Sequence, residues 1–575
     1  MPTSRVAVLG GGISGLSAAY HLSRLLPPSA RIVLLERQQR LGGWLQSTPL
    51  TTQDDSDKDS GRVLEAGPRT LRPNSLAIME LIHRLELDNS LVIVPKTHPA
   101  ARARFIDFPP LTLLPASLPS LLASPANPAL RGLLPAILAE PFRTSSPPAI
   151  ANNILSEAAT GVAAKVLDKD ESLYSLISRR FGDRFAREYL SAIIHGIYAT
   201  DARALSVRAT FPFLWDASRS PSSSSSLSDG SSRSILREPA PRHNYYDTGA
   251  IEAKLKGAAM YTFRGGIQTL SDALRRNLQD TPNVELWTGV GATRIVPREE
   301  GIEIFTTTGA TQPFMATHVV SAVQLPILDK LLKTGSVYLP HLDAKTNPAS
   351  SVLVVNLIFP PQTTPSASSP SQGPNSSAGA LLHPDGFGCL VPRPQSGYLT
   401  QAEVDARANS RGPDEEVDIS HALLGVVFDS AVDPDAGSPS ATEQPTRLTL
   451  MLGGPHPLPQ TISTNPTSNV DLNRFIPPLL RHLARTLSWP SSSPIPTPSR
   501  IRAEYHQNCI PIYTLGHVQR MRELKQALGF DTAKGPWKGR LHVVGAGVRG
   551  ISLGDCVSSG RDAAFAIAQS VGPAA

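Results

Sequence analysis

Three glycines near the start of the chain have the spacing of a phosphate-binding turn. Apolar residues 6–9 predict a buried strand, and Gly10, Gly12 and Gly15 follow it in the pattern G-x-G-x-x-G. In this pattern the first glycine permits a tight turn, the second lets the backbone approach a pyrophosphate, and the third lets a helix pack closely on the strand. Apolar residues at helical spacing over 16–25 predict that helix. The chemistry indicated is the binding of a dinucleotide through its diphosphate.

A second strand and an acidic residue complete the unit that would position these glycines. Residues 31–35 predict the strand, and Glu36 stands at its end, about 20 residues past the last glycine. A carboxylate there can accept hydrogen bonds from the hydroxyls of a ribose. Strand, turn, helix, second strand and acid all agree, which favours a βαβ dinucleotide-binding unit over a glycine-rich turn without a ligand.

A second pair of glycines narrows the choice of dinucleotide. Arg40, Gly42, Gly43 and Trp44 follow the acid closely, and such a pair beside the pyrophosphate is not part of the generic nicotinamide pattern. The guanidinium of Arg40 has the planar fork that suits phosphate oxygens. This tandem resembles the FAD-binding start of the flavin amine oxidase superfamily, so we expect FAD rather than NAD.

The end of the chain carries another glycine-rich loop. Residues 541–544 predict a buried strand, 545–547 a turn, and 550–554 a loop before a last helix with Asp555 as its N-cap. A glycine-rich loop that leads into a helix N-terminus is suited to an anion or a ring oxygen. The alternative is an ordinary strand–loop–helix packing unit.

Chain length, net charge and cysteine spacing limit the classes of function that this chain could have. A chain of 575 residues is expected to form roughly two to four domains. The net charge of +6 is small for this length and basic residues form no long runs, so nucleic-acid binding is not indicated. A pI of about 9.2 would suit an anionic membrane surface. Cys389, Cys509 and Cys556 lie far apart without metal-ligand or C-x-x-C spacing, which indicates a reducing compartment.

An apolar segment, 108–150, has two interpretations that the sequence leaves open. Its short proline-separated helices could form the core of a helical subdomain, or a monotopic membrane patch that admits an apolar substrate. The uncharged run 108–130 contains six prolines, which excludes a simple transmembrane helix, so any membrane contact is expected to be peripheral. Because the first strand begins by Arg5, we expect no cleavable presequence.

Predicted strands indicate a sheet domain inserted between two nucleotide-binding segments. Residues 301–307 alternate between apolar and polar side chains, as a half-buried strand does. Further strands are predicted at 284–287, 318–323, 352–359, 386–391, 423–428 and 447–452. Pro-, Ser- and Gly-rich inserts, expected to be mobile and not functional, lie at 360–380, 394–418, 433–446 and 488–500. The serine-rich segment 218–237 is expected to be a disordered loop.

Several short motifs are more specific than the glycine fingerprint. They are Glu65 with 67–73 (GPRTLRP), 98–101 (HPAA) before Arg104 and Phe105, 196–199 (GIYA) with Asp201 and 205–206 (LS), 508–511 (NCIP), 513–517 (YTLGH), and Gly550 with Asp555, Cys556, Gly560 and Arg561. Together they resemble the protoporphyrinogen oxidase family, in its mitochondrial eukaryotic form with long insertions. Thr200 departs from the glycine that the family has there.

This resemblance implies an architecture. The fold class is α/β (α+β): a Rossmann-like FAD-binding domain of p-hydroxybenzoate hydroxylase type, an inserted substrate-binding sheet domain and a helical membrane-binding domain. The predicted FAD-binding domain is assembled from three segments, 1–105, 258–325 and 513–575. Between them lie the helical membrane-binding and substrate-access domain at 106–215, a low-complexity loop at 216–257, and the substrate-binding sheet domain with disordered inserts at 326–512.

The resemblance also implies a reaction and a cofactor site. The reaction is the oxidation of protoporphyrinogen IX to protoporphyrin IX, the penultimate step of heme biosynthesis, in which six electrons pass through FAD to three O₂ and give three H₂O₂. FAD carries this chemistry, so no nucleophile is required; the sequence offers no convincing acid/base pair, and no metal site is expected. The implied FAD site comprises Gly10, Gly11, Gly12, Ile13, Ser14, Gly15, Glu36, Arg37, Arg40, Gly42, Gly43, Trp44, Gly67, Pro68, Arg69, Thr70, Ala292 (where the family usually has Val), Ala546, Ile551, Ser552 and Leu553.

Three residues are implied to meet the substrate. A largely apolar macrocycle with propionates needs aliphatic walls and an arginine at its rim. By the resemblance, Arg104 binds a propionate, Leu357 is a wall residue, and Gly196 brings backbone near the ring. Without the resemblance, Arg104 would be taken as a surface salt bridge and Leu357 as a core leucine.

Partners and location follow from the resemblance alone. It implies protoporphyrinogen IX and O₂ as substrates, peripheral attachment to the mitochondrial inner membrane, a homodimer, contact with ferrochelatase, and no nucleic acid. Two alternatives remain: another FAD amine oxidase or desaturase of the superfamily, and a binding protein without flavin chemistry, like the GDP-dissociation inhibitors. An aromatic content of 6% gives little support to the aromatic cage of an amine site. The intact Glu36, Gly42 and Gly43 argue against the binding protein.

Overall fold

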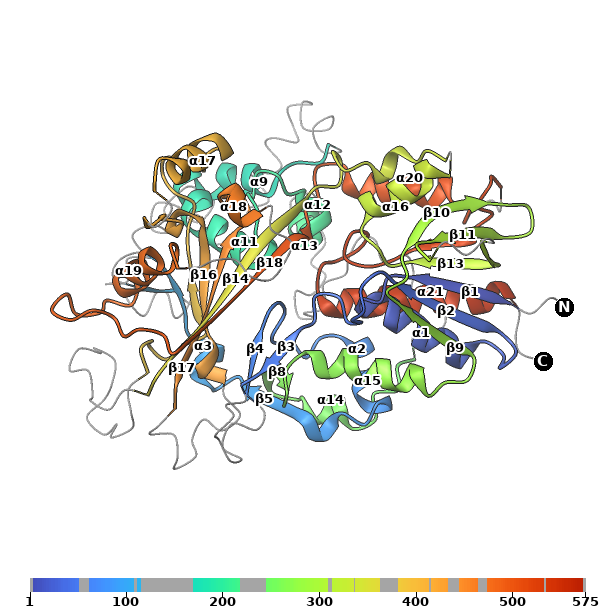
Figure 1. Ribbon diagram of the computed structural model, residues 1–575, viewed down its shortest axis with the longest axis horizontal. Coiled ribbons are helices and arrows are strands. Elements are labelled where there is room, and N and C mark those ends of the chain that lie inside the picture. Colours follow the sequence, from blue (N-terminus) through green and yellow to red (C-terminus); the bar gives the residue numbers. More distant parts are fainter. Residues whose placement is uncertain are drawn as a thin grey trace. The chain divides into compact units, whose positions relative to one another are not determined.

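The computed structural model describes residues 4–50, 62–107, 111–114, 169–217, 245–308, 313–335, 337–361, 381–412, 415–432, 444–463, 473–531 and 534–571 (Figure 1). Contacts divide the chain into two compact units. Unit 1 comprises Met1–Ile93, Arg233–Pro348 and Gly516–Ala575, and unit 2 comprises Val94–Ser232 and Ala349–Leu515. The predicted domain divisions at 105, 325 and 512 differ from these boundaries by up to about two dozen residues.

Unit 1 is built on a five-stranded parallel sheet in the order β19-β13-β1-β2-β9. Strand β1 is almost entirely apolar and its last four residues are buried, as expected of a parallel strand covered on both faces. The elements of unit 1 are β1 (Arg5–Leu9), α1 (Ile13–Leu25), β2 (Arg31–Glu36), β3 (Ser47–Pro49), β4 (Val63–Glu65), α2 (Leu76–Arg84), β5 (Leu91–Pro95), α14 (Ile251–Lys254), β8 (Ala258–Phe263), α15 (Gln268–Gln279), β9 (Val284–Thr288), β10 (Ala292–Pro297), β11 (Ile302–Thr306), β12 (Phe314–Ala316), β13 (His318–Ser321), α16 (Leu325–Thr334), α20 (His517–Ala527), β19 (Leu541–Val543) and α21 (Leu553–Val571).

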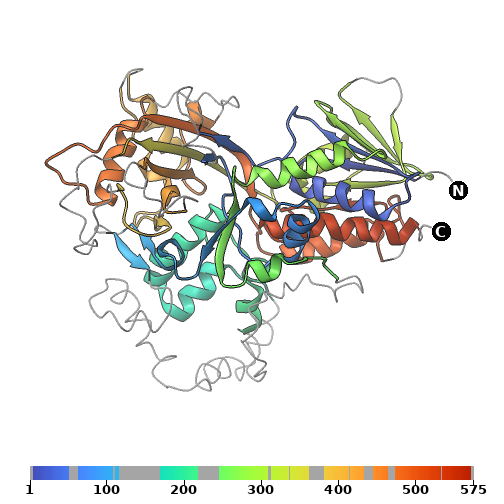
Figure 2. The ribbon, with the colours of Figure 1, turned by 90° about the horizontal axis from the view of Figure 1, so that it is seen from below.

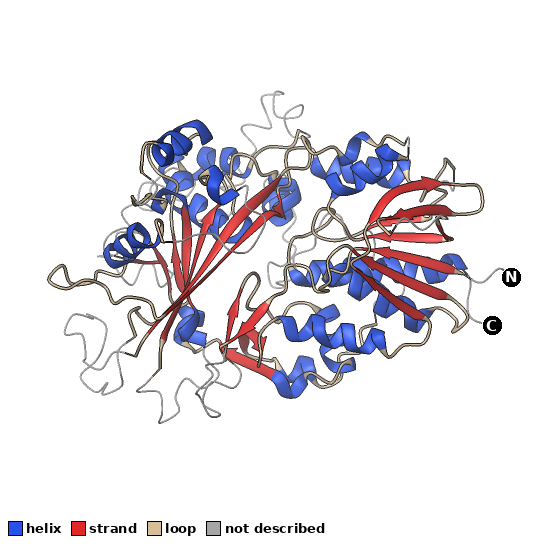
Figure 3. Ribbon diagram, viewed as in Figure 1, coloured by secondary structure: helices blue, strands red, loops and turns tan. Residues whose placement is uncertain are grey.

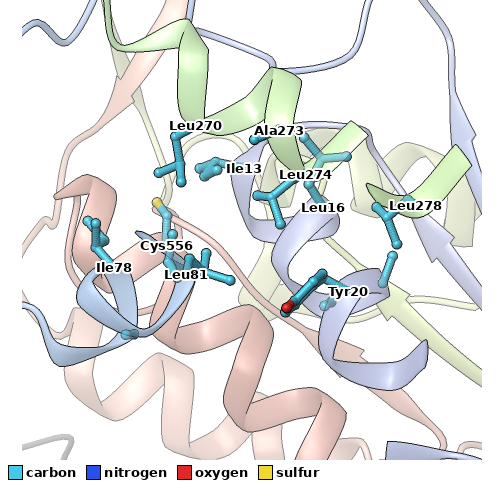
Figure 4. Packing of buried hydrophobic residues seen from close by; sticks show 14 of the residues in the cluster. Ile13, Leu16, Tyr20, Ile78, Leu81, Leu270, Ala273, Leu274, Leu278 and Cys556 are labelled. Carbon is cyan, nitrogen blue, oxygen red and sulfur yellow. The ribbon is translucent and has the colours of Figure 1, made fainter. Parts of the chain in front are cut away.

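The two faces of this sheet carry separate cores. Val6 and Val8 of β1 face helices α1, α2, α15 and α21, whose apolar side chains meet in one cluster (Figure 4). Ala7 and Leu9 point to the opposite face, where they join side chains of β10, β11 and α16. The period of two along a strand therefore explains how one sheet supports both layers.

Helices α1 and α21 join the two ends of the chain and lie side by side in unit 1 (Figure 2). They can approach closely because Gly560 has no side chain. A Cβ at this position would stand 2.3 Å from the carbonyl oxygen of Ser14. The buried hydroxyl of Ser17 donates to the carbonyl of Val557 at 2.8 Å. Helix α21 therefore packs directly on α1, the helix that follows the glycine fingerprint.

A buried ion pair ties α21 to α2. Nε of Arg561 lies 2.8 Å from a carboxylate oxygen of Glu80, and both side chains are 4% exposed. Nη2 of Arg561 donates to the carbonyl of Tyr245 at 2.9 Å, and the rings of Tyr246 and Phe565 lie 4.0 and 4.5 Å from its guanidinium carbon. The charge is therefore fully enclosed by a partner, a carbonyl and two rings.

Unit 2 is built on a mixed seven-stranded sheet in the order β18-β14-β17-β16-β15-β6-β7, drawn in red on the left of Figure 3. Along β14, Leu353, Val355 and Leu357 face the core that includes Leu479 and Leu483 of α19, while Val352 and Val354 face a smaller cluster on the other side. The elements of unit 2 are α3 (Pro99–Arg102), β6 (Arg104–Ile106), β7 (Thr112–Leu114), α9 (Leu173–Phe181), α10 (Asp183–Phe185), a π-helical turn (Ala186–Leu190), α11 (Ser191–Tyr198), α12 (Val207–Thr210), α13 (Pro212–Ala217), β14 (Ala349–Phe359), β15 (Gly388–Leu390), α17 (Gln401–Asn409), β16 (Leu423–Phe428), β17 (Thr446–Gly453), α18 (Gln460–Ser463), α19 (Ile476–Thr486) and β18 (Arg500–Pro511).

Three local predictions are wrong. The insert 394–418 contains helix α17, which begins with a capping box between Thr400 and Glu403. Helix α1 begins at Ile13 rather than at residue 16. Asp555 is not the N-cap of α21, because that helix begins at Leu553. The predicted inserts 360–380 and 433–446 lie mostly, and the serine-rich loop 218–237 wholly, outside the described residues.

The predicted membrane segment can be followed over only a few residues. Residues 115–168, which hold most of the apolar stretch 108–150, lie outside the described residues. Among the helices that are described, none combines the length and the apolar character needed to cross a bilayer.

Candidate functional site

The glycine fingerprint forms a turn whose shape requires glycine at positions 10 and 15, and a third glycine, Gly11, packs against the end of a leucine side chain. Gly10 has a φ of +97°, which L side chains rarely adopt. A Cβ at Gly15 would stand 2.0 Å from the carbonyl oxygen of Gly10, and one at Gly11 would stand 2.3 Å from Cδ2 of Leu41. These residues bring strand, turn and helix together without leaving room for a side chain.

Gly12 differs from the other glycines because space is open beside it. It has φ −71° and ψ 176°, and an added Cβ would meet nothing closer than Cα of Gly43 at 4.0 Å. Gly12 is the N-cap of α1, which has no side-chain cap and no acidic residue in its first turn. The first N–H groups of α1 therefore offer donors and positive potential to an anion, with room for it to approach the backbone.

Glu36 stands at the end of β2 and is fixed by two backbone donors. Its Oε2 accepts a hydrogen bond from the N–H of Gly11 at 2.7 Å and its Oε1 from the N–H of Gln38 at 2.8 Å. Each carboxylate oxygen has a second acceptor site, so the group can also receive ribose hydroxyls. The acid predicted from the sequence thus lies directly beside the glycine turn.

The second glycine pair packs on the first turn. The N–H of Gly42 donates to the carbonyl of Gly11 at 2.8 Å, and a Cβ at Gly43 would stand 3.1 Å from Cα of Gly12. The guanidinium of Arg40 donates to the carbonyls of Leu41 at 3.1 Å and Leu45 at 2.9 Å, and to that of Gly43. Arg40 therefore fixes the loop that carries the glycine pair, and its contact with a phosphate stays a prediction.

The Glu65 motif belongs to the same assembly through contacts that the sequence does not reveal. The buried carboxylate of Glu65 accepts from the N–H of Ile267 and from the hydroxyl of Ser47, both at 2.8 Å. Gly67 lies so close to the first loop that its Cβ would stand 2.6 Å from the carbonyl oxygen of Trp44. Glu65 thus ties the segment with Pro68, Arg69 and Thr70 to the start of α15.

The C-terminal loop is anchored to the helix that follows it. The N–H of Gly545 donates to Oγ of Ser559 at 3.0 Å. Ser552, rather than Asp555, caps α21: Oγ of Ser552 accepts from the N–H of Asp555 at 3.1 Å and donates to its carboxylate at 2.6 Å. A Cβ at Gly545 would lie 3.4 Å from Oγ of Ser14, so this loop adjoins the start of α1.

All the predicted cofactor residues fall in unit 1, and those of the two glycine loops, the 67–70 segment and the C-terminal loop adjoin one another. Arg37 is exposed, and a Cβ at Gly291 would lie 3.3 Å from its Cβ and Cγ. Ala292 is the first residue of β10. An uncapped helix start, an open backbone at Gly12 and a fixed carboxylate fit a dinucleotide such as FAD.

The three predicted substrate residues fall in unit 2, on different elements. Arg104 starts β6, is partly buried, and has its guanidinium carbon 5.7 Å from the ring centre of Phe387. Gly196 is exposed on α11, where a Cβ would stand 2.5 Å from Cδ2 of Leu390. Leu357 has no exposed surface and packs within the core of unit 2. Strand β15, which holds Leu390, pairs with β6, so the elements of Arg104 and Gly196 both adjoin it.

The departure at Thr200 has a structural explanation. The left-handed residue that ends α11 is Ala199, with φ 46° and ψ 46°, and Thr200 is not among the residues with positive φ. A threonine is therefore accommodated without backbone strain, and the mismatch with the family motif does not disturb this turn.

Two further features of the described residues bear on metal binding and on cavities. No group of three or more His, Cys, Asp or Glu side chains there could hold a metal ion. A cavity of about 520 Å³ lies in unit 2, lined by α19 residues such as Arg481 and by Trp489, and it includes none of the three predicted substrate residues.

Comparisons with known proteins agree with this assembly. A family model described as flavin containing amine oxidoreductase matches residues 13–410. The chain is 29% identical to the protoporphyrinogen oxidase of Schizosaccharomyces pombe over 582 residues, and 30% identical to that of Homo sapiens over 577 residues, with 98% of both chains covered in each case. The solved structure of a protein titled a putative protoporphyrinogen oxidase, from Exiguobacterium, superposes with a TM-score of 0.65 at 18% identity, covering 99% of this chain and 100% of the other.

Proposed function

Because the chain belongs to the family of flavin-containing amine oxidoreductases, we propose that it oxidises protoporphyrinogen IX to protoporphyrin IX with bound FAD, and that O₂ is the electron acceptor. The observation that carries the proposal is similarity over 98% of both chains to relatives named protoporphyrinogen oxidase. Similarity of that extent covers both units, whereas the glycine fingerprint alone would support only the cofactor.

The residues of unit 1 supply the cofactor site. The N–H groups at the start of α1 and the open backbone of Gly12 would hold the diphosphate, and Glu36 would hold a ribose. The loop 545–552 and the segment 67–70 would adjoin the ring system. FAD held by these residues would supply the redox chemistry, namely hydride acceptance from a porphyrinogen carbon and electron transfer to O₂. Removal of six electrons would reduce three O₂ to three H₂O₂.

The residues of unit 2 would hold the substrate. Arg104 combines a guanidinium with a partly buried position, which suits a propionate of the macrocycle. Gly196 would offer backbone without a side chain, whereas Leu357 has no exposed surface in this structure, so it could support an apolar wall only from behind. Each two-electron step must also release a proton, and no side chain of this chain is assigned as its acceptor, because the sequence offers no convincing acid/base pair.

The architecture and the location are included in the proposal. We expect a p-hydroxybenzoate hydroxylase-type FAD domain, an inserted substrate domain and a helical membrane-binding domain within 106–215. Peripheral attachment to the mitochondrial inner membrane, dimer formation and contact with ferrochelatase also belong to it. The apolar composition of 108–150 is the feature of this chain that supports membrane contact.

An aerobic assay tests the proposal. Purified protein is mixed with protoporphyrinogen IX, and protoporphyrin fluorescence and H₂O₂ are followed against an enzyme-free control that measures autoxidation. The proposal predicts fluorescence well above the control, with one H₂O₂ for each pair of electrons removed. A protein that instead oxidises only coproporphyrinogen III, the substrate named for a Bacillus subtilis relative 23% identical over 97% of this chain, or only an amine, would refute it.

A further inference from the structure

A buried histidine outside the predicted site bonds to the C-terminal loop. His517 is the first residue of α20 and is 2% exposed. Its Nε2 lies 3.2 Å from the carbonyl oxygen of Val548, which is in the loop between β19 and α21. Since a carbonyl can only accept, Nε2 must carry the proton and donate it. Burial lowers the pKa of His517 to about 4, so the imidazole is neutral at pH 7.

The N–H of Val544, where the loop begins, donates to the carbonyl of Ser321 on β13 at 2.9 Å. Three bonds further along the loop run to α21. They join Gly545 to Ser559 at 3.0 Å and Arg549 to Asp562 at 2.7 Å, and a further bond caps the helix at Ser552. Each could still form if the loop tilted together with α21. The His517 bond reaches the loop from a different helix, so it opposes that tilt.

The position of Val548 gives this bond its importance. The N–H of Val548 donates to the carbonyl of Gly545 at 3.1 Å and closes a turn around Ala546 and Gly547, while the carbonyl that His517 binds belongs to the next peptide. Rotation about Val548 on loss of the His517 bond would re-aim that carbonyl and disturb the turn that ends at the same residue. Fixed dipoles beside a redox cofactor tune both its affinity and its potential.

We propose that His517 is a positioning residue that holds the 545–552 loop in the orientation required to bind the isoalloxazine ring of FAD. This inference rests on the proposed function for the identity of the ring, and on the hydrogen bond of His517 for the mechanism. His517 acts through the backbone of Val548 and is assigned no contact with substrate or reacting atoms.

Four proteins test it: wild type, His517→Ala, His517→Gln and His517→Asn. The amide nitrogen of Gln lies one bond further along the side chain than that of Asn, so it is the one that can take the place of Nε2. A matched control is His21→Ala, which removes another buried imidazole of unit 1, 6% exposed, from the middle of α1. The measurements are FAD affinity of each apoprotein by flavin fluorescence quenching, and the midpoint potential of each holoprotein.

The expected result is an FAD dissociation constant raised roughly three- to tenfold in His517→Ala and His517→Asn, as for the loss of one hydrogen bond. His517→Gln should restore most of the affinity and the wild-type potential, and His21→Ala should bind FAD as wild type does. Equal affinity in wild type and His517→Ala, or equal effects of Gln and Asn, would overturn the inference. Should the Ala variant not fold, the Gln and Asn pair decides it. Wild type that binds FAD but leaves protoporphyrinogen IX unoxidised would refute the proposed function while the histidine comparison still stands.

Discussion

The open space beside Gly12 leads to a prediction that separates cofactor binding from folding. Ala can adopt the φ of −71° and ψ of 176° at this position, and its Cβ would lie 4.0 Å from the nearest protein atom. Gly12→Ala should therefore fold, and its stability should change by less than about 1 kcal/mol. The loss of a glycine N-cap and the lower entropy of the unfolded chain have opposite signs and similar size.

The same methyl group would stand where the diphosphate must approach the backbone. Crowding of a well-packed contact by one methyl typically costs about 1–3 kcal/mol. The FAD dissociation constant of Gly12→Ala should thus rise about 5- to 150-fold. Gly15→Ala is the matched comparison, because its Cβ would stand 2.0 Å from the carbonyl oxygen of Gly10. That variant should lose stability even without cofactor.

The assay measures two quantities on each apoprotein: the thermal unfolding midpoint and the FAD affinity from fluorescence quenching. The expected pattern is an unchanged midpoint with weakened FAD binding for Gly12→Ala, and a lowered midpoint for Gly15→Ala. If Gly12→Ala bound FAD as tightly as wild type, the diphosphate would not approach the backbone there, and the assignment of the turn would be refuted.

Three further predictions concern the substrate, the buried ion pair and pH. Arg104→Ala should raise KM for protoporphyrinogen IX by an amount equivalent to about 1–3 kcal/mol, whereas the neighbouring exposed Arg102→Ala should leave it unchanged in steady-state assays. Arg561→Leu should lower the free energy of unfolding in urea by at most about 3–5 kcal/mol, because the buried Glu80 carboxylate would lose its partner at 2.8 Å and keep only Arg84 at 3.5 Å; adding Glu80→Leu should recover some of the loss, and additive losses would contradict the pairing. Burial lowers the pKa of His21 to about 3, so the folded protein binds fewer protons than the unfolded chain, and this term is lost as pH falls below about 6.5. Between pH 7 and 5.5, the free energy of unfolding in urea should therefore fall by about 1 kcal/mol less for His21→Phe than for wild type, and parallel pH profiles would contradict this.

The start of the chain was predictable because its signals are local. Four apolar residues, three glycines and an acid about 20 residues later specify strand, turn, helix and strand without reference to the rest of the chain. Helix α17 could also have been predicted, since Thr400 and Glu403 form the sequence signature of a capping box. The Pro-, Ser- and Gly-rich composition of the insert 394–418 instead led to the prediction of a mobile segment. The N-cap prediction for Asp555 was wrong because Ser552, three residues earlier, accepts the hydrogen bond from the N–H of Asp555 and so caps the helix.

Other features could not be predicted because they depend on residues far apart in the sequence. Glu65 finds its donor at Ile267, 202 residues away, and Arg561 finds Glu80 at a separation of 481. No spacing rule relates such residues before the fold brings them together. For Leu357, the sequence alone already indicated a core leucine, and only the identity of the layer that covers it, which includes α19, depends on distant residues.

The most direct test of the proposed function is reduction of the bound flavin in the absence of oxygen. Purified holoprotein is mixed anaerobically with protoporphyrinogen IX, and the visible flavin absorbance is followed together with porphyrin fluorescence. We predict that absorbance is lost as porphyrin product forms, and that it returns with H₂O₂ when O₂ is admitted. Flavin that stays oxidised in the presence of protoporphyrinogen IX, yet is reduced by an amine, would contradict the proposed function.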